Sequence, residues 1–172
     1  GHITDGIGFM QSLKDNDIDV IGKKMTIAGA GGAATAIEIQ AALDGVKEIS
    51  IFNIKDAFFE RTLQTAEKIK KAVPECVVNV YDIADTAKMT EEITSSDIFA
   101  NATIVGMKPM DDQSVVKDLS AFRPGLVVCD AVYNPAETKL LREAKEAGCT
   151  CIGGKGMLLW QGVAAFRFYT GM

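Results

Sequence analysis

The chain has 172 residues, 48% of them hydrophobic and 24% charged, with a formal net charge of -5. This composition is typical of one globular domain, and the acidic balance argues against a nucleic-acid-binding surface, which needs clustered Lys and Arg. The longest apolar stretches are strand-sized and no signal peptide is visible, so we expect no membrane segment and a cytoplasmic location.

The first expected element is a helix that opens near Thr4 and Asp5. Either residue suits the N-cap, where a side-chain oxygen accepts hydrogen bonds from the unpaired N–H groups of the first turn. The helix ends near residue 16, and its apolar side chains are expected to face the core: Phe9, Met10 and Leu13.

Residues 24–56 form the stretch around which the chain is organised. A short run with β-branched residues, 24–28, ends in the pattern G-x-G-x-x-A at residues 29–34. A helix then continues to Asp44-Gly45, and a second strand begins at residue 49. Together they predict a βαβ unit of about 30 residues. The apolar face of its helix is expected at Ala33, Ala36, Ile37, Ala41 and Leu43.

The glycine pattern predicts a dinucleotide site. In such a unit Gly29 makes the tight turn, Gly31 lets backbone N–H groups approach a pyrophosphate, and the small Ala34 lets the helix pack closely on the strand. The helix N-terminus, with its unpaired N–H groups and positive partial charge, then faces the phosphates. A tight turn without a ligand is the alternative for this motif taken alone, and the flanking strands favour the dinucleotide.

Strands and helices alternate through the rest of the chain. We expect helices over 57–73, 85–94, 137–147 and 157–168, and strands over 76–83, 97–103, 126–132 and 149–153. This alternation predicts an α/β fold, a Rossmann-type doubly wound, mostly parallel six-stranded sheet of order 3-2-1-4-5-6 with helices on both faces. Ligands bind at the carboxyl edge of such a sheet.

The cysteines lie at or next to expected strands, without C-x-x-C spacing: Cys76, Cys129, Cys149 and Cys151. We therefore expect buried, reduced thiols and no metal site. The only histidine, His2, follows Gly1 in a pair that resembles an expression scar, so no histidine-based catalysis is inferred from it.

The choice between NAD and NADP depends on the end of the second strand. A carboxylate there accepts a hydrogen bond from the ribose 2′-hydroxyl of NAD, whereas an arginine accommodates the 2′-phosphate of NADP. The strand ends in Asn53, Ile54, Lys55 and Asp56. With one Lys and one Asp we expect NAD to be preferred and NADP to be tolerated. Asp56 also suits the N-cap of the next helix.

Four separated segments together resemble the motifs of the shikimate dehydrogenase family. They are residues 4–6 (Thr-Asp-Gly), 29–33 (Gly-Ala-Gly-Gly-Ala), 101–107 (Asn-Ala-Thr-Ile-Val-Gly-Met) and 154–161 (Gly-Lys-Gly-Met-Leu-Leu-Trp-Gln). Residues 133–135 (Tyr-Asn-Pro) fit as well. The resemblance is closest to the quinate/shikimate dehydrogenase branch and covers nearly the whole chain.

The resemblance implies that residues 1–172 form an NAD(P)-binding Rossmann domain. Members of the family also have an N-terminal α/β domain, which supplies most of the substrate pocket and a catalytic lysine. That domain is expected to be absent from this chain. The fragment alone is therefore expected to be inactive, and the family pattern allows a homodimer of the full-length protein.

The implied reaction is reversible hydride transfer between a nicotinamide and the carbon bearing the 3-hydroxyl of shikimate or quinate, in aromatic amino-acid biosynthesis or quinate metabolism. As hydride leaves carbon the hydroxyl proton must leave oxygen, so an acid/base pair is required. By resemblance Asp5 is one member of the pair and the absent lysine is the other. Tyr133 and Gln161 would bind the substrate; a capping or helix-surface role is their alternative.

The resemblance also implies the cofactor contacts. These are Ala30, Gly31, Gly32, Ala33, Asn53, Ile54, Lys55, Asp56, Thr103, Val132, Gly154 and Met157. Gly154 would approach the nicotinamide ring, with Met157 packing nearby. Ile54 occupies the position of an arginine in NADP-specific relatives, and Asp56 matches an aspartate of the branch that accepts either cofactor.

Three alternatives stay open at this point. A methyltransferase on the same fold would leave Gly31 and Ala34 without a role and would not explain Asp5 or Gln161. A stand-alone dinucleotide-sensing module would need no partner domain. A paralogous dehydrogenase for an amino-substituted shikimate analogue would differ mainly in the domain that carries substrate selectivity.

Overall fold

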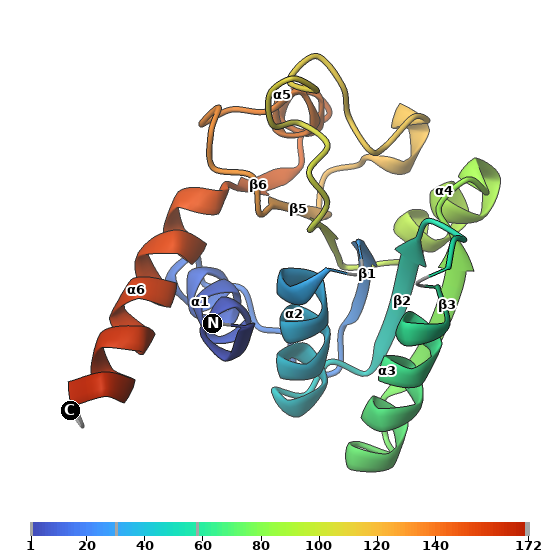
Figure 1. The fold of residues 1–172 in the computed structure, drawn as a ribbon. Helices are drawn as coiled ribbons and strands as arrows, with labels where there is room; N and C mark the ends of the chain where they lie inside the picture. The colour runs from blue at the N-terminus through green and yellow to red at the C-terminus, as the bar shows by residue number, and fades with distance from the viewer. Residues whose placement is uncertain (1, 30, 58, 171–172) are drawn as a thin grey trace.

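The computed structural model describes the backbone of residues 2–29, 31–57 and 59–170, and the side chains within these ranges except those of residues 2, 3, 161 and 168–170. Six strands form one parallel sheet in the order β3-β2-β1-β4-β5-β6. The predicted Rossmann-type arrangement is therefore confirmed (Figure 1).

The strands are β1 (Lys24–Ala28), β2 (Glu48–Asn53), β3 (Val77–Asp82), β4 (Ile98–Asn101), β5 (Val127–Asp130) and β6 (Thr150–Ile152). The helices are α1 (His2–Asp15), α2 (Gly32–Leu43), α3 (Phe59–Ala72), α4 (Thr86–Thr94), α5 (Lys139–Glu146) and α6 (Gly154–Thr170), with a 3-10 turn η1 (Leu119–Ala121). The predicted N-cap at Thr4 or Asp5 is wrong. The helix α1 already begins at His2, so both residues lie within its first turns.

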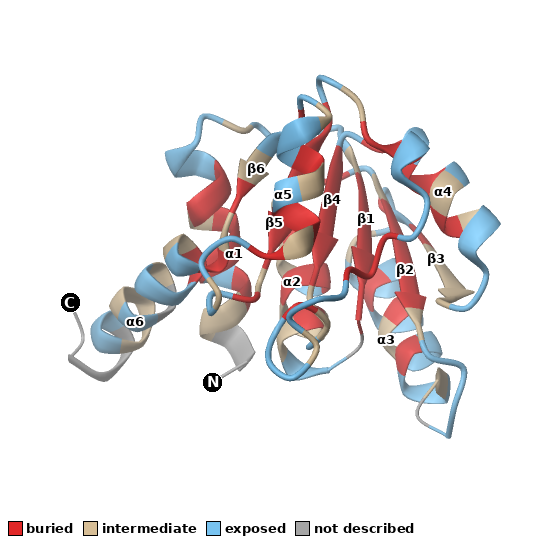
Figure 2. Cartoon of the chain, turned by 90° about the horizontal axis from the view of Figure 1, so that it is seen from above, coloured by how far each residue is buried: buried red, intermediate tan, exposed pale blue. Residues whose placement is uncertain are grey.

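The sheet separates two apolar clusters. One contains side chains of α1, α2 and α3 together with Met157 of α6, and the other contains side chains of α4, η1 and α5. Figure 2 shows the buried strands between these outer layers. Helices therefore cover both faces of the sheet, as expected for parallel strands joined by crossover helices.

The buried face of α2 differs from the predicted one. The helix buries Ala34, Ile37, Glu38, Ala41 and Ala42, whereas Leu43 is 59% exposed. The buried residues belong to one stripe of the helix, and the neighbouring α1 packs closely on its flank. A Cβ added at Gly6 of α1 would lie 2.4 Å from the carbonyl oxygen of Ala36. In Figure 1, α1 lies between α6 and α2.

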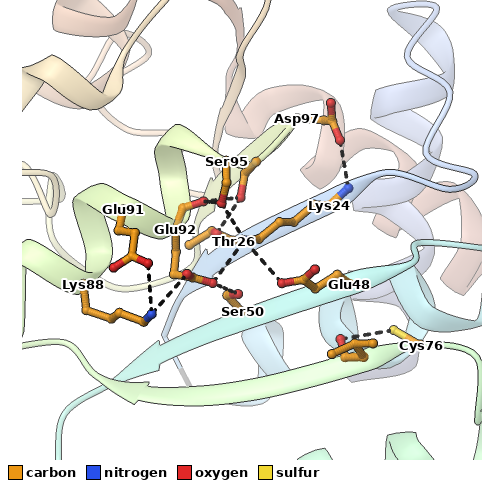
Figure 3. A network of polar contacts seen from close by, with 12 residues as sticks. Lys24, Thr26, Glu48, Ser50, Cys76, Lys88, Glu91, Glu92, Ser95 and Asp97 are labelled. Carbon is orange, nitrogen blue, oxygen red and sulfur yellow. Dashed lines mark hydrogen bonds and ion pairs between the residues drawn. The ribbon is translucent and has the colours of Figure 1, made fainter.

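A polar network ties β1, β2 and α4 together near the amino ends of the strands (Figure 3). Lys24 Nζ lies 3.1 Å from Glu92 Oε1 and 3.3 Å from Glu48 Oε2. Ser50 Oγ donates to the same Glu92 oxygen at 2.6 Å. Lys88 Nζ lies 3.5 Å from the other Glu92 oxygen. The buried carboxylate of Glu92 is thus satisfied by two lysines and a hydroxyl, as a buried charge requires.

The described part of the chain contains no helix that is both long and apolar enough to cross a membrane.

Candidate functional site

The turn after β1 is built on a glycine that no other residue could replace without strain. Gly29 has φ +123°, and a Cβ there would lie 2.7 Å from the carbonyl oxygen of Ala102. Its N–H donates to the carbonyl oxygen of Phe52 at 2.8 Å. Gly29 is therefore held between the carboxyl ends of β2 and β4, where only a residue without a side chain fits.

The start of α2 is open to a ligand. Gly31 is the N-cap, with φ -71° and ψ -173°, and it supplies no side-chain cap. Gly31 and Gly32 are exposed, and a Cβ added at Gly31 would meet no atom within 4 Å. The start of α2 is thus exposed and has no side-chain cap, as is typical of a helix N-terminus that binds phosphate. Ala33 is half-buried, and Ala30 lies outside the described residues.

The end of β2 lies beside this turn, because Ala28 of β1 pairs with Phe52 of β2 in register. Asn53 is half-buried, and its Nδ2 donates to Thr62 Oγ1 of α3 at 3.0 Å. The next three residues, Ile54, Lys55 and Asp56, are exposed. The structure therefore brings the predicted pyrophosphate turn and the predicted ribose-binding residues to one edge of the sheet.

Beyond β4, Thr103 is held by Asn101. The Thr103 N–H and hydroxyl donate to Asn101 Oδ1 at 3.0 and 2.6 Å, while Asn101 Nδ2 donates to the carbonyl oxygen of Val105 at 3.0 Å. The same Nδ2 donates to Asp130 Oδ1 at 3.1 Å. A single buried amide thus orients the loop after β4 and connects it to β5.

Asp130 is the second buried member of this link, with 2% of its surface exposed. It accepts hydrogen bonds from the Thr138 hydroxyl at 2.7 Å and the Val132 N–H at 3.0 Å. Burial raises the pKa of Asp130 to about 6, although these hydrogen bonds and that of Asn101 favour the ionised form. Sequence reasoning assigned no role to Asp130, because an acidic residue ending a strand gives no local signal of its partners.

Val132 is buried, and the next residue, Tyr133, is 49% exposed beyond the sheet edge. Gly154 approaches this segment closely, because a Cβ there would lie 2.6 Å from the carbonyl oxygen of Ala131. It is the first residue of α6, which begins three residues earlier than predicted. Met157 is 7% exposed and belongs to the core cluster under α1.

Asp5 and Gln161 lie on helices beside the sheet. Asp5 is half-buried in the first turn of α1, a helix that packs closely against α6. A Cβ added at Gly156 would lie 2.7 Å from Ser12 Oγ. Gln161 lies in α6, but its side chain is outside the described part.

The four cysteines are free thiols, three of them buried and Cys151 half-buried. Among the described residues, no group of three or more His, Cys, Asp or Glu could hold a metal ion. The predicted burial is confirmed for Cys76, Cys129 and Cys149, whereas Cys151 is only partly buried. Burial raises the pKa of the Cys129 thiol above its usual range.

Comparisons with known proteins point to one group of enzymes, although no family model matches the chain. The chain is 54% identical over 170 residues to a shikimate dehydrogenase (NADP(+)) of Listeria monocytogenes serotype 4b, covering 99% of this chain and 58% of that protein. It thus spans little more than half the length of that relative.

Two solved structures have the same fold. Shikimate 5-dehydrogenase from Listeria monocytogenes, in complex with shikimate and NAD, matches with a TM-score of 0.94 and 52% identity, over 98% of this chain and 58% of that one. Quinate dehydrogenase from Corynebacterium glutamicum, in complex with NAD, matches with a TM-score of 0.84 and 28% identity. The match covers 98% of this chain and 57% of that one.

Proposed function

Since the segment that this chain covers belongs to the shikimate dehydrogenase family, we propose that residues 1–172 are the cofactor-binding domain of an NAD(P)-dependent shikimate or quinate dehydrogenase. The observation that carries the proposal is the open start of α2. Gly29 makes a turn that only glycine fits, and Gly31 leaves space in front of the uncapped N–H groups. This is a cradle for a pyrophosphate.

The remaining cofactor contacts follow the carboxyl edge of the sheet. Asn53 to Asp56 would bind the adenosine ribose, beside the pyrophosphate turn. Thr103 and Val132 would contact the cofactor from the ends of β4 and β5, and Gly154 would let the nicotinamide half approach the backbone. Asn101 and Asp130 support this assignment, because their hydrogen bonds hold both of these loops in place.

The chemistry needs groups that accept and return a proton. When bound, the nicotinamide supplies the site that accepts or donates hydride. Asp5 would hold the hydroxyl proton of the substrate in a pair with a lysine of an N-terminal domain. The exposed Tyr133, together with Gln161 of α6, would orient the substrate from the cofactor side. On this assignment the chain alone binds cofactor but does not turn over.

We propose NAD as the preferred cofactor, with NADP tolerated. The end of β2 carries an exposed carboxylate at Asp56 and an uncharged side chain at Ile54, and a carboxylate favours the free 2′-hydroxyl of NAD. The relatives support use of both nucleotides, because one is named for NADP and others were solved with NAD.

The test is a calorimetric titration of this chain with NAD and, separately, with NADP. We expect NAD to bind more tightly, and Gly31→Val to abolish binding of both because its side chain fills the phosphate space. Gly162→Val on α6 is the matched control, since a Cβ there also meets no atom within 4 Å. Failure of the wild-type chain to bind either nucleotide, with folding intact, would contradict the proposal.

A stand-alone dinucleotide-sensing module is the second candidate, because it would show the same binding. Joining the chain to the N-terminal domain of its own natural reading frame separates the two. A dehydrogenase gains NAD-dependent oxidation of shikimate or quinate, whereas a sensing module does not.

A further inference from the structure

A groove of about 620 Å3 runs between α2 and α3. It spans the length of α2, because its lining includes both the first residue of that helix, Gly32, and the last, Leu43. Thr62 and Thr65 contribute to it from α3. Sites for small molecules have volumes in this range. Since α2 leads away from the carboxyl edge of the sheet, the groove extends well beyond the phosphate cradle.

Glu38 is a buried carboxyl that lines this groove. Only 1% of the residue is exposed, and its Oε1 has no hydrogen-bond partner among the described residues. An unpaired polar atom at this depth destabilises a fold, because the oxygen has lost water without gaining another partner. A molecule that enters the groove can supply the missing partner.

The protonation state of Glu38 indicates what kind of partner fits. Burial raises the pKa of this carboxyl well above its ordinary value, which favours the uncharged acid. A carboxylic acid offers an oxygen that accepts a hydrogen bond and an O–H that donates one. A primary carboxamide presents the complementary pair, an N–H donor beside a carbonyl acceptor. It therefore satisfies the acid without placing a charge in a buried site, where a charge is costly.

The side chains around Glu38 suit an apolar body on such a ligand. Thr35, Ile39 and Leu43 line the groove at four-residue intervals, so they form one row along α2. Ile39 is 42% exposed and Leu43 is 59% exposed. A bound ring would remove part of this apolar surface from water. An apolar wall beside a buried polar group is the composition typical of small-molecule sites.

We propose that the α2–α3 groove is a second ligand site, separate from the proposed cofactor site. It binds an uncharged molecule that carries a primary carboxamide on an apolar ring, with the amide paired to Glu38. Glu38 lies about two turns along α2 from Gly31, a rise of about 10 Å. This ligand and a nucleotide can therefore be bound at the same time.

The test is a titration of the whole chain with benzamide, monitored by two-dimensional NMR of the backbone amides. We expect shifts concentrated on groove residues such as Thr35 and Thr65, with a Kd on the order of 1 mM for a molecule of this size. Benzoate has the same shape but lacks the donor, so it should bind about 10-fold more weakly. Saturating NAD should change the benzamide Kd by less than about 2-fold, because the sites are separate.

Two substitutions test the role of Glu38. Glu38→Leu should fold, since an apolar side chain replaces an unpaired polar group, and it should weaken benzamide binding by about 10-fold or more. Glu38→Gln keeps an uncharged donor and acceptor and should stay within about 3-fold of the wild-type affinity. The matched control is Glu67→Leu, because Glu67 is an exposed glutamate of α3 that pairs with Lys70 at the surface. It should leave benzamide binding unchanged.

Three results would overturn the second site: no shifts in the groove, displacement of benzamide by NAD, or equal benzamide affinity in the wild-type chain and Glu38→Leu. Tighter binding of the cationic isostere benzamidine would overturn the amide assignment, because it requires an ionised Glu38. None of these results bears on the proposed function, since NAD binding to the wild-type chain is measured separately.

Discussion

Asn101 and Asp130 join the carboxyl ends of two neighbouring strands through their side chains, with Asn101 Nδ2 donating to Asp130 Oδ1 at 3.1 Å. The two residues also pair in the β4–β5 register. From this link the amide orients Thr103, and the carboxyl receives the Val132 N–H just before Tyr133. Two loops of the candidate site therefore share one buried polar anchor, which a change in either residue should disturb.

The first prediction concerns the protonation of Asp130. Its pKa is about 6 in the folded protein and ordinarily near 3.8, so the folded state binds the proton more tightly than the unfolded state. The stabilisation from this group is complete below about pH 4 and is lost as the pH rises through about 6, up to about 3 kcal/mol.

Asp130→Asn should remove that part of the pH dependence. Urea unfolding at pH 4.5 and pH 7 measures it, with the exposed Asp111→Asn as the control. An unchanged difference between the two pH values in Asp130→Asn would exclude this role of the buried carboxyl.

The second prediction concerns the network around Glu92. Burial raises the pKa of this carboxyl, but the hydrogen bonds of Ser50 and Lys24 and the nearby lysine charges outweigh burial and lower it overall. The stabilisation is therefore present at neutral pH and is lost as the pH falls through the lowered pKa.

Glu92→Gln should reduce the free energy of unfolding by about 2 kcal/mol at pH 7, because it leaves Lys24 without one of its charged partners. The neighbouring Glu91→Gln is the control. Glu91 is 68% exposed and pairs with Lys88 at the surface, so it should cost less than about 0.5 kcal/mol. Equal losses in the two variants, compared by urea unfolding, would show that burial of the network does not matter.

The third prediction separates the two glycines of the turn. Gly29→Ala should lower the free energy of unfolding by about 2 to 4 kcal/mol, because a Cβ meets the Ala102 carbonyl oxygen and the positive φ disfavours alanine. Gly31→Ala should cost less than about 1 kcal/mol, since its backbone is extended and its surroundings are open.

Gly22→Ala isolates the contribution of the backbone, because Gly22 has φ +74° and no atom within 4 Å of an added Cβ. In thermal or urea unfolding, the stability of Gly22→Ala should lie between those of Gly29→Ala and Gly31→Ala. Equal stability of Gly29→Ala and Gly22→Ala would mean that the backbone around Gly29 shifts to make room for the added methyl group, so that the close contact costs nothing.

The fourth prediction tests the proposed acid/base role of Asp5, in a protein that joins the chain to the proposed N-terminal domain. Asp5→Asn should lower kcat by on the order of 100-fold or more, the range for the loss of a general acid/base, with a small effect on the Kd of the cofactor. Steady-state kinetics and a cofactor titration measure the two quantities. Asp17→Asn, an exposed change beyond the end of α1, is the control, and unimpaired turnover of Asp5→Asn would remove the residue from the chemistry.

Much of the fold was predictable from local patterns. Alternating strands and helices predict parallel pairing with right-handed crossovers, because few topologies satisfy short connections and buried faces, and the strand order is confirmed. Predictions that depended on helix orientation were less accurate. Leu43 was expected in the core and is exposed, while Glu38, which no apolar pattern would select, is buried. The buried face of α2 is set by its contacts with the rest of the fold, which periodicity within α2 does not specify.

The sequence by itself determined the glycine turn and the positions of the strand ends, because these depend on residues close together in the chain. Only the tertiary structure decided which distant groups share the sheet edge. Asn101 and Asp130, whose side chains share a hydrogen bond, are 29 residues apart in sequence. Hydrogen bonds and burial are set by contacts between separate segments, so the raised pKa of Asp130 and the burial of Glu38 become visible only once the chain is folded.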